Sequence, residues 1–263
     1  MRATLLGFCL FFSVSAVMAA DAELMRLDTG NDSRGWEAVG RLDIGGKGFC
    51  TGALIAPNLV LTAAHCLFDK TTGEPVDVTR IEFLAGWRNG RASAYRWVKR
   101  AAVNPDYDYA DRAEPSRVRN DVALLELTQA VRNTTIIPFD TDIRPSKGDR
   151  IGVVSYAYNR ANAPALQEVC RVVARQEGVL VMSCNVDFGS SGAPVFSFEG
   201  GVPRIVSVVS AKAQVEGVPV ALGTQLEEPL IVLKEILAEE TGLINAVKPT
   251  EARRQTGAKF IKP

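Results

Sequence analysis

Short apolar runs separated by turn residues dominate this sequence and restrict the folds open to it. Each run is rich in β-branched residues or alternates apolar with polar positions, and Gly, Pro, Asn or Asp brackets it. Because helical periodicity is absent between the runs, they predict an antiparallel sandwich or barrel, not an α/β sheet. The predicted strands are 38–44, 49–55, 59–62, 80–85, 95–103, 122–127, 150–156, 166–174, 178–184, 193–198, 204–211 and 218–225.

One segment near the end of the sequence has a helical pattern. Leu230, Leu233, Ile236 and Leu237 fall on one face, and Pro229 stands at a favourable start. With 263 residues, the chain is long enough for one large domain or two small ones. We therefore expect an all-β protein with one C-terminal helix.

Residues 1–20 have the composition of a secretory signal peptide. Arg2 gives a positive start, residues 5–14 are apolar apart from Ser13, and small residues at 17–20 suit cleavage. The apolar run is too short for a stable membrane span, so a retained anchor is the weaker alternative. We expect a soluble protein, secreted or periplasmic, with no membrane contact after the signal is removed.

The two flanks of the predicted barrels or sandwich are polar. An N-terminal segment at 21–35 contains a Gly-, Asn- and Asp-rich loop, and Arg34 within it is a candidate processing site. The basic stretch at 246–263 predicts a solvated tail. Over the whole chain 30 basic residues balance 30 acidic ones, which gives no electrostatic footprint for nucleic acid or an anionic membrane.

The cysteine content agrees with export. Cys9 leaves with the signal peptide, and an even number remains for an oxidising compartment: Cys50, Cys66, Cys170 and Cys184. Three connectivities are possible, of which nearest-neighbour pairing is the simplest. Each such bridge closes a loop of about fifteen residues, worth roughly 3 kcal/mol in the chain-entropy model. The sequence has no Cys-x-x-Cys spacing, and we expect no metal and no cofactor.

His65 is the only histidine in the chain and the natural candidate for a catalytic base. It follows an apolar strand in the sequence Leu-Thr-Ala-Ala-His-Cys at 61–66, where small residues allow a tight turn. A lone histidine is more often structural, but a bridged Cys66 beside it would hold this backbone rigid. Breaking an amide also needs a nucleophile and a group that orients the base.

The nucleophile candidates lie in Phe-Gly-Ser-Ser-Gly-Ala-Pro at 188–194. Small residues on both sides leave room for a bulky peptide. The backbone N–H groups of Gly189 and Ser191 are candidates to converge on one developing oxyanion. An ordinary Gly/Ser turn is the alternative, and spacing alone does not choose between Ser190 and Ser191.

Asp121 has the best context for the orienting carboxylate. It leads directly into the apolar strand at 122–127, which would bury it and so require a donor such as an imidazole N–H. Asp106, Asp108 and Asp111 lie in a polar loop with tyrosines and are expected to be solvated.

Three motifs, in this order, resemble the signatures of the trypsin/chymotrypsin family of serine proteases. They are Leu-Thr-Ala-Ala-His-Cys at 61–66, Asn-Asp-Val-Ala-Leu-Leu at 120–125 and Gly-Ser-Ser-Gly-Ala-Pro at 189–194. The order His, Asp, Ser differs from that of subtilisins and α/β-hydrolases. The run at 49–55 is also similar to the family, and the resemblance extends from about Gly35 to Glu240.

The resemblance implies a fold of two perpendicular six-stranded antiparallel β-barrels. The first would span 36–135, and the second, with the C-terminal helix, 136–245. It also implies the Cys50–Cys66 bridge and a monomeric serine endopeptidase that hydrolyses polypeptide substrates through an acyl-enzyme. The catalytic residues implied are the triad His65, Asp121 and Ser191, with an oxyanion hole at the N–H groups of Gly189 and Ser191.

The residue before the nucleophile departs from the family pattern. Animal members carry an aspartate there, which pairs with the newly freed N-terminus on activation, whereas this chain has the uncharged Ser190. The chain therefore looks more like the bacterial branch that includes glutamyl endopeptidases. We expect that cleavage at Arg34 is not required for activity.

The implied specificity pocket consists of Asn185, Ser210 and Lys212. Asn185 stands near the position where trypsins carry an aspartate that selects basic residues. The pocket histidine of glutamyl endopeptidases has no counterpart, because His65 is the only histidine. Lys212 is a candidate to attract an acidic substrate side chain, with a surface lysine as the alternative. The residue preference stays open.

Two other functions are alternatives to a protease. A non-catalytic homologue that uses the scaffold for binding is the runner-up, although all three triad positions are occupied. An esterase of different fold would need a strand–nucleophile–helix context, which the sequence does not show.

Overall fold

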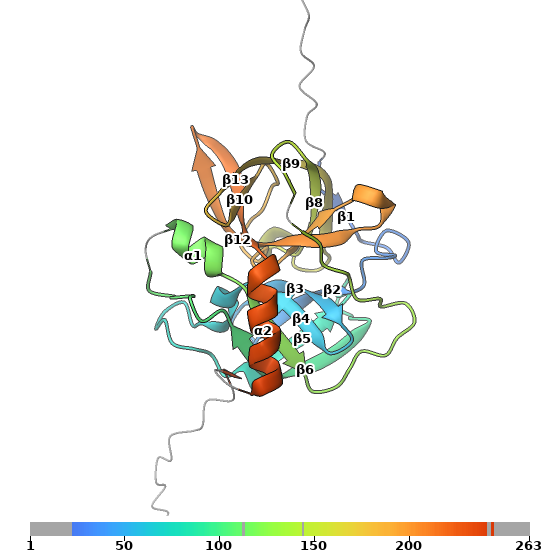
Figure 1. Ribbon diagram of the computed structural model, residues 1–263. Helices are drawn as coiled ribbons and strands as arrows, with labels where there is room; N and C mark the ends of the chain where they lie inside the picture. Colours follow the sequence, from blue (N-terminus) through green and yellow to red (C-terminus); the bar gives the residue numbers. More distant parts are fainter. Residues whose placement is uncertain (1–22, 112–113, 144, 241–242, 245–263) are drawn as a thin grey trace, which may run out of the picture.

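The computed structural model describes residues 23–111, 114–143, 145–240 and 243–244 (Figure 1). Two closed antiparallel β-barrels, stacked one above the other in Figure 1, account for most of it. All the strands predicted from the sequence are present, with shifts at their ends. The predicted signal peptide at 1–20 and the basic tail at 246–263 lie outside the described residues.

The first barrel is the lower one in Figure 1. Its strands are paired in the order β6-β5-β2-β3-β4-β7, and the pairing of β6 with β7 closes the ring. Alternate side chains point inward, so that Leu42, Leu54, Phe83 and Leu124 are almost fully buried. The strands are β2 (Val39–Ile44), β3 (Phe49–Ala56), β4 (Leu59–Thr62), β5 (Ile81–Ala85), β6 (Ala94–Val103) and β7 (Ala123–Leu127).

The second barrel follows the first in the sequence and has the same construction. Its order is β9-β10-β13-β12-β11-β8, closed by the pairing of β8 with β9. Ile151, Met182, Val195 and Val206 fill its interior. The strands are β8 (Arg150–Ser155), β9 (Ala165–Gln176), β10 (Val179–Met182), β11 (Pro194–Ser197), β12 (Arg204–Val215) and β13 (Val218–Gln225).

One apolar cluster runs from inside the first barrel into the interface between the barrels. Tyr156 and Phe196 of the second barrel belong to the same cluster as Leu54 of the first. The Trp36 ring packs on Phe139 and Phe196, with centroid distances of 5.9 and 5.0 Å. The barrels are therefore packed into one unit by a shared core.

In the described parts of the chain, two α-helices flank the barrels. The predicted C-terminal helix is α2 (Glu227–Glu239), which crosses the first barrel in contact with β6 and β7 (Figure 1). It buries Leu230, Leu233 and Leu237, as the pattern predicted. The other helix, α1 (Glu114–Asn120), was not predicted from the sequence; it is short and polar, and Val118 is its one buried hydrophobic residue. A helix without an apolar face gives no periodic signal.

The two ends of the described chain pair with opposite barrels. At the N-terminal end β1 (Met25–Arg26) adds to β9 of the second barrel. At the C-terminal end β14 (Leu243–Ile244) adds to β6 of the first. Both are too short for a sequence pattern to mark them.

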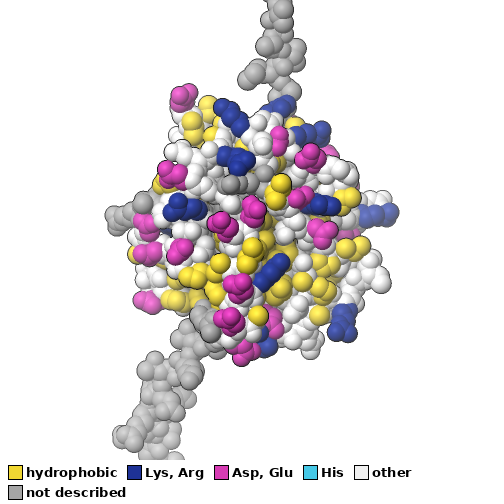
Figure 2. Space-filling view, in the orientation of Figure 1, with side chains coloured by type: hydrophobic (Ala, Val, Ile, Leu, Met, Phe, Trp, Pro, Cys, Tyr) yellow, Lys and Arg dark blue, Asp and Glu magenta, His cyan; other side chains and the backbone are white. Residues whose placement is uncertain are grey.

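The surface over α2 carries charges of both signs. Figure 2 shows acidic and basic side chains interspersed on this face, with apolar side chains on either side of α2. This face therefore presents no continuous field of one sign. Among the described residues, no helix has the length and apolarity needed to cross a bilayer.

Candidate active site

His65 lies in a single 3₁₀ turn, η1 (Ala64–Leu67), which directly follows β4. The small residues Ala63 and Ala64 are fully buried, so the chain turns tightly against the barrel. Cys66 in the same turn forms a disulfide with Cys50 on β3, with a Cα–Cα distance of 6.3 Å. This bridge fixes the backbone that carries the imidazole.

Asp121 lies between α1 and β7 and is only 1% exposed. Its Oδ1 accepts the backbone N–H of His65 at 2.8 Å, and its Oδ2 lies 2.6 Å from Nδ1 of the same residue. The carboxylate thus holds both the backbone and the ring of His65. Burial, with the negative charge of Asp121, raises the pKa of the nearby Tyr107 above its usual range.

Two hydroxyl groups support Asp121 from the second barrel. Ser210, in the middle of β12, donates to Asp121 Oδ2, the oxygen that also faces the imidazole. Thr224 on β13 donates to the carbonyl oxygens of Val118 and Asp121 at 2.6 and 3.1 Å. Sequence reasoning missed Thr224, because its role depends on the strand register of the second barrel.

The loop at 187–193 leaves two of its backbone N–H groups unused. The N–H groups of Asp187, Phe188, Ser190, Gly192 and Ala193 all donate hydrogen bonds. Within the described part of the chain, those of Gly189 and Ser191 have no acceptor. Gly189 has φ = +97°, a conformation that only glycine adopts at little cost. Two unpaired donors on one loop form the arrangement that an oxyanion requires.

The two adjacent serines have different surroundings. Ser190 is fully buried, and its Oγ lies 3.1 Å from the Tyr156 carbonyl oxygen. Ser191 is partly exposed, and among the described residues its hydroxyl has no hydrogen-bond partner. Only the second of the two has a hydroxyl accessible to a substrate.

Thr51 on β3 connects the His65 side of the site with this loop. Its backbone N–H donates to the Ser191 carbonyl oxygen at 2.8 Å. Its Oγ1 donates to the Gly189 carbonyl oxygen at 2.9 Å and accepts the Tyr156 N–H at 3.1 Å. The loop also touches the segment before His65, because a Cβ on Gly192 would lie 2.9 Å from the Ala63 nitrogen. Thus the two barrels meet at the candidate site.

The three residues implied for the specificity pocket have separate environments. Ser210 faces Asp121, as described above. Lys212 is exposed, and its Nζ lies 3.8 Å from Asp187 Oδ1. Asn185 is exposed, and its backbone N–H donates to the Gln167 side chain at 2.7 Å.

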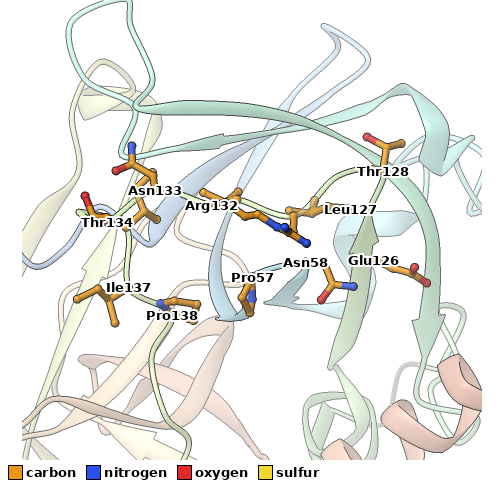
Figure 3. Close-up of a pocket in the computed structure, with 13 residues that line it drawn as sticks. Pro57, Asn58, Glu126, Leu127, Thr128, Arg132, Asn133, Thr134, Ile137 and Pro138 are labelled. Carbon is orange, nitrogen blue, oxygen red and sulfur yellow. The ribbon is translucent and has the colours of Figure 1, made fainter.

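Two hollows differ in their relation to this site. One, of about 440 Å³, borders His65, the Cys50–Cys66 bridge and Phe49. The other, of about 830 Å³, lies at the ends of β4 and β7 and contains none of the candidate residues (Figure 3). Of its two charged residues, Glu126 and Arg132, the first is already paired with Lys99 and Arg100. The first hollow is therefore the one suited to hold a substrate beside the base.

The described residues include two disulfides and one cluster of metal-ligating side chains. Cys170 is bonded to Cys184, with a Cα–Cα distance of 5.1 Å, as in the simplest pairing. Donor atoms of Cys50, His65 and Cys66 lie within 4.8 Å of one another. Because both sulfurs belong to a disulfide, this cluster offers no thiolate ligands.

Comparison with known proteins gives one family and several relatives. A family model for the trypsin-like peptidase domain matches residues 50–202. Kallikrein 1-related peptidase b24 of Mus musculus is 30% identical over 111 residues, which cover 40% of each chain. Mast cell protease 3 of Ovis aries is 28% identical over 180 residues, covering 64% of this chain and 67% of that protein. This chain spans less than half the length of the kallikrein.

Solved structures share the two-barrel fold. A Glu endopeptidase in complex with MPD superposes with a TM-score of 0.67 and 17% identity, covering 85% of this chain and 99% of that one. An inactivated protease paralogue of the scabies mite gives a TM-score of 0.61 and 15% identity, covering 78% and 94%. At these identities the likeness concerns the fold.

Proposed function

Because this chain belongs to the trypsin-like peptidase family, we propose that it is a serine endopeptidase with the catalytic triad His65, Asp121 and Ser191. One observation carries the proposal. The imidazole is paired with a buried carboxylate, while the loop packed against the same turn offers an accessible hydroxyl and two unused N–H groups. This arrangement has a base, its orienting group, a nucleophile and an oxyanion site.

The proposed reaction is acyl transfer from a peptide to water. His65 takes the proton of Ser191 Oγ as that oxygen attacks the scissile carbonyl carbon, and the N–H groups of Gly189 and Ser191 stabilise the oxyanion. Asp121 holds the Nδ1–H and stabilises the imidazolium. His65 then protonates the leaving amine, and water repeats the steps on the acyl-enzyme to release the acid.

We propose polypeptide substrates, a monomeric state and a secreted or periplasmic location. Two disulfides are typical of a protein that folds in an oxidising compartment. The signal-peptide pattern at 1–20 supports the same location.

For specificity, we propose that Asn185, Ser210 and Lys212 contribute in different ways. Ser210 acts through Asp121, whereas Asn185 and Lys212 are exposed at the edge of the site. Because the charges of Lys212 and Asp187 offset each other, we expect little charge preference at the residue before the scissile bond. Profiling with a peptide library tests this, and a preference of about 100-fold for acidic or basic residues, some 2.7 kcal/mol, would contradict it.

Labelling with a serine-directed fluorophosphonate tests the proposed function. The wild type and the Ser191→Ala and Ser190→Ala variants would be purified with both disulfides formed, and the modified peptide identified by mass. We expect wild type to label on Ser191, Ser190→Ala to label more slowly on the same residue, and Ser191→Ala not to label. A folded, disulfide-bonded wild type that does not label would favour a non-catalytic binding scaffold.

A further inference from the structure

Arg160 is a buried cation that the proposed reaction does not use. It ends the 3₁₀ turn η3 (Tyr158–Arg160) and is only 7% exposed. Its Nη1 donates to the Ser155 carbonyl oxygen, and its Nη2 donates to Ser155 Oγ at 3.0 Å. The same Nη2 donates to Ser190 Oγ at 3.3 Å. The guanidinium therefore reaches the residue that precedes the proposed nucleophile.

The charge on Arg160 has no direct counterion. Within the described part of the chain, no carboxylate oxygen lies within 4.0 Å of its nitrogens. Burial lowers the pKa of Arg160 to about 10, so the group is still charged at neutral pH. Burying a cation costs several kcal/mol, and the attraction of the more distant Asp187 carboxylate offsets only part of that cost, because the hydrogen-bond partners of the guanidinium are neutral oxygens. A buried arginine is therefore a poor choice for stabilising the fold, because an apolar side chain at 160 would avoid the desolvation cost.

Ser190 links Arg160 to the turn that carries the unused N–H groups. Its Oγ accepts from Arg160 and from the Asp187 N–H at 3.3 Å, and it donates toward the Tyr156 carbonyl oxygen. The Ser190 N–H closes the turn on the Asp187 carbonyl oxygen at 2.9 Å. This turn contains the peptide of Gly189, whose freedom at positive φ would otherwise let its N–H rotate away.

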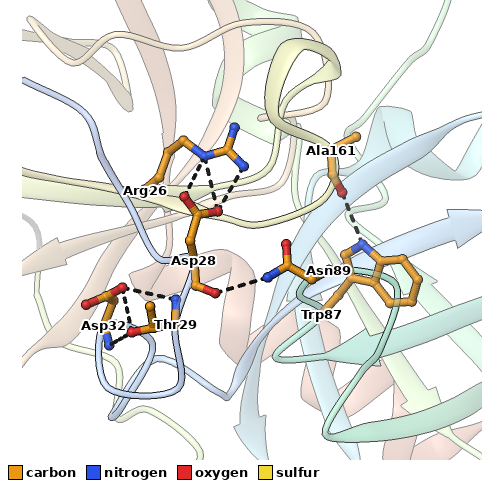
Figure 4. A network of polar contacts seen from close by, with 7 residues as sticks. All are labelled: Arg26, Asp28, Thr29, Asp32, Trp87, Asn89 and Ala161. Atoms are coloured by element: carbon orange, nitrogen blue, oxygen red, sulfur yellow. Dashed lines mark hydrogen bonds and ion pairs between the residues drawn. The ribbon is translucent and has the colours of Figure 1, made fainter.

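Hydrogen bonds from Trp87 and Asn89 hold the segment that follows Arg160 (Figure 4). Trp87 Nε1 donates to the Ala161 carbonyl oxygen at 3.1 Å. The Asn89 backbone N–H donates to the Asn162 carbonyl oxygen at 2.6 Å. The Asn89 side chain donates to the Asp28 carbonyl oxygen at 3.1 Å, which adds the N-terminal segment to the same junction. Arg160 is thus fixed at both its backbone and its guanidinium.

We propose that Arg160, acting through Ser190, is a positioning residue that holds the Gly189 and Ser191 N–H groups toward the substrate carbonyl. This inference rests on the proposed function. The cation lies within the chain from the start, so the oxyanion site is formed without a new N-terminus. Arg160 touches no reacting atom, and its loss should affect the transition state far more than substrate binding.

The first test compares Arg160→Met with Arg171→Met, which changes an exposed arginine on β9 of the same barrel. Loss of one oxyanion donor costs about 100- to 1000-fold in kcat, so a displaced donor should cost Arg160→Met at least about tenfold. We expect KM to change less than about threefold and Arg171→Met to match wild type. The downfield proton resonance of the His65–Asp121 hydrogen bond should persist in both variants. If Arg160→Met keeps the wild-type kcat, or loses that resonance along with its thermal stability, the proposal is wrong.

The second test is a double-mutant cycle that includes Ser190→Asp. A carboxylate at 190 would lie beside Arg160 Nη2 and pair with it directly, and the kcat of this variant is the reference for the cycle. Adding Arg160→Met should then cost at least about tenfold more in kcat than in the wild-type background, because the new carboxylate loses its partner. Additive effects would overturn the coupling. If Arg160→Met does not accumulate, Arg160→Lys takes its place, because a lysine lacks the guanidinium fork whose two nitrogens bond the Ser155 carbonyl oxygen and the two serine hydroxyls. A wild-type kcat for that variant overturns the proposal.

The two proposals fail differently. A wild type that does not react with fluorophosphonate overturns the serine-protease function itself. An active wild type whose Arg160 variants keep full kcat overturns only the positioning role.

Discussion

Gly192 follows the proposed nucleophile and lies where the two barrels touch. It has φ = +77°, and a Cβ there would lie 2.1 Å from Thr62 Oγ1 and 2.3 Å from the Thr51 carbonyl oxygen. A backbone carbonyl cannot move aside as a flexible side chain can. Glycine at 192 is therefore required both by its dihedral angle and by its neighbours.

We expect Gly192→Ala to lower the free energy of unfolding by about 3 kcal/mol or more, combining the left-handed conformation with overpacking. The matched control is Gly200→Ala, because Gly200 has the same φ of +77° but no atom within 4 Å of its added Cβ. The control should lose about 1–2 kcal/mol. Urea unfolding measures both, and equal losses would show that the contact with the first barrel does not matter.

A second prediction concerns the Thr51 hydroxyl. Thr51→Val keeps the shape of the side chain but leaves the buried Tyr156 N–H and Gly189 carbonyl oxygen without that partner. We expect a loss of about 1–3 kcal/mol in unfolding free energy and a lower kcat, because the loop at 187–193 loosens. Thr51→Ser, which keeps the hydroxyl, should retain most of both. Thermal unfolding and peptide hydrolysis provide the measurements, and two variants with the same losses would contradict the role of the hydroxyl.

The residues proposed for catalysis could be predicted from the sequence, whereas those that support them could not. His65 and Asp121 stand in short motifs that can be recognised locally. Thr51 acts on Gly189 across 138 residues and Thr224 on Val118 across 106. Such partners are brought together only by barrel closure and strand register. The resemblance to the family placed Ser210 in the specificity pocket, whereas its hydrogen bond to Asp121 could be found only from the structure.

At the scale of elements, ion pairs join the C-terminal end of α2 to the first barrel. Arg100 on β6 bonds both Glu126 on β7 and, at 2.7 Å, Glu240 after α2. Burial opposes the charge on Glu126, but hydrogen bonds from Arg100 and Lys99 outweigh it and lower the pKa of Glu126. A carboxyl with a lowered folded-state pKa stabilises the fold above its unfolded pKa, and this stability is lost as pH falls through the folded value.

Glu126→Gln should therefore destabilise the protein by about 1–2 kcal/mol at pH 7 and much less below pH 4. Glu235→Gln, which changes an exposed residue of α2, is the control and should follow wild type at every pH. Melting temperatures between pH 3 and pH 7 would check this. A gap between wild type and Glu126→Gln that stays constant over that range would refute the assignment.

The ends of a strand could be predicted from the sequence only where its buried side chains form a clear apolar pattern. The strands at 59–62 and 218–225 were predicted to the residue. The strand predicted at 204–211 continues to Val215, because its last residues pair with β13 in an exposed hairpin that lacks an apolar face. Pairing partners, not side-chain pattern, define such extensions and the two-residue strands at the chain ends.

On the scale of the whole molecule, the N-terminal segment is part of the folded protein. Leu27 is fully buried, and its N–H donates to the Pro164 carbonyl oxygen at 2.9 Å beside the β1–β9 pairing. A chain beginning at Gly35 would lose all of these contacts. Full burial of a leucine is worth about 1.5–3 kcal/mol, so cleavage after Arg34 should weaken the fold.

We expect the chain beginning at Gly35 to melt several degrees below one beginning at residue 21, with no gain in kcat. Leu27→Ala in the longer chain keeps the backbone pairing and should melt between the two. Calorimetry and peptide hydrolysis on the three proteins test this. An inert longer chain and an active shorter one would instead establish activation by cleavage.

The placement of α2 on the first barrel has a consequence for timing. About 100 residues separate the end of β7 from the start of α2. At about 5–20 residues per second, the first barrel waits roughly 5–20 s for its covering helix during synthesis. His65 and Asp121 precede Ser191 by a similar delay. During synthesis the proposed base His65 therefore exists without the proposed nucleophile until residue 191 of 263 has been added.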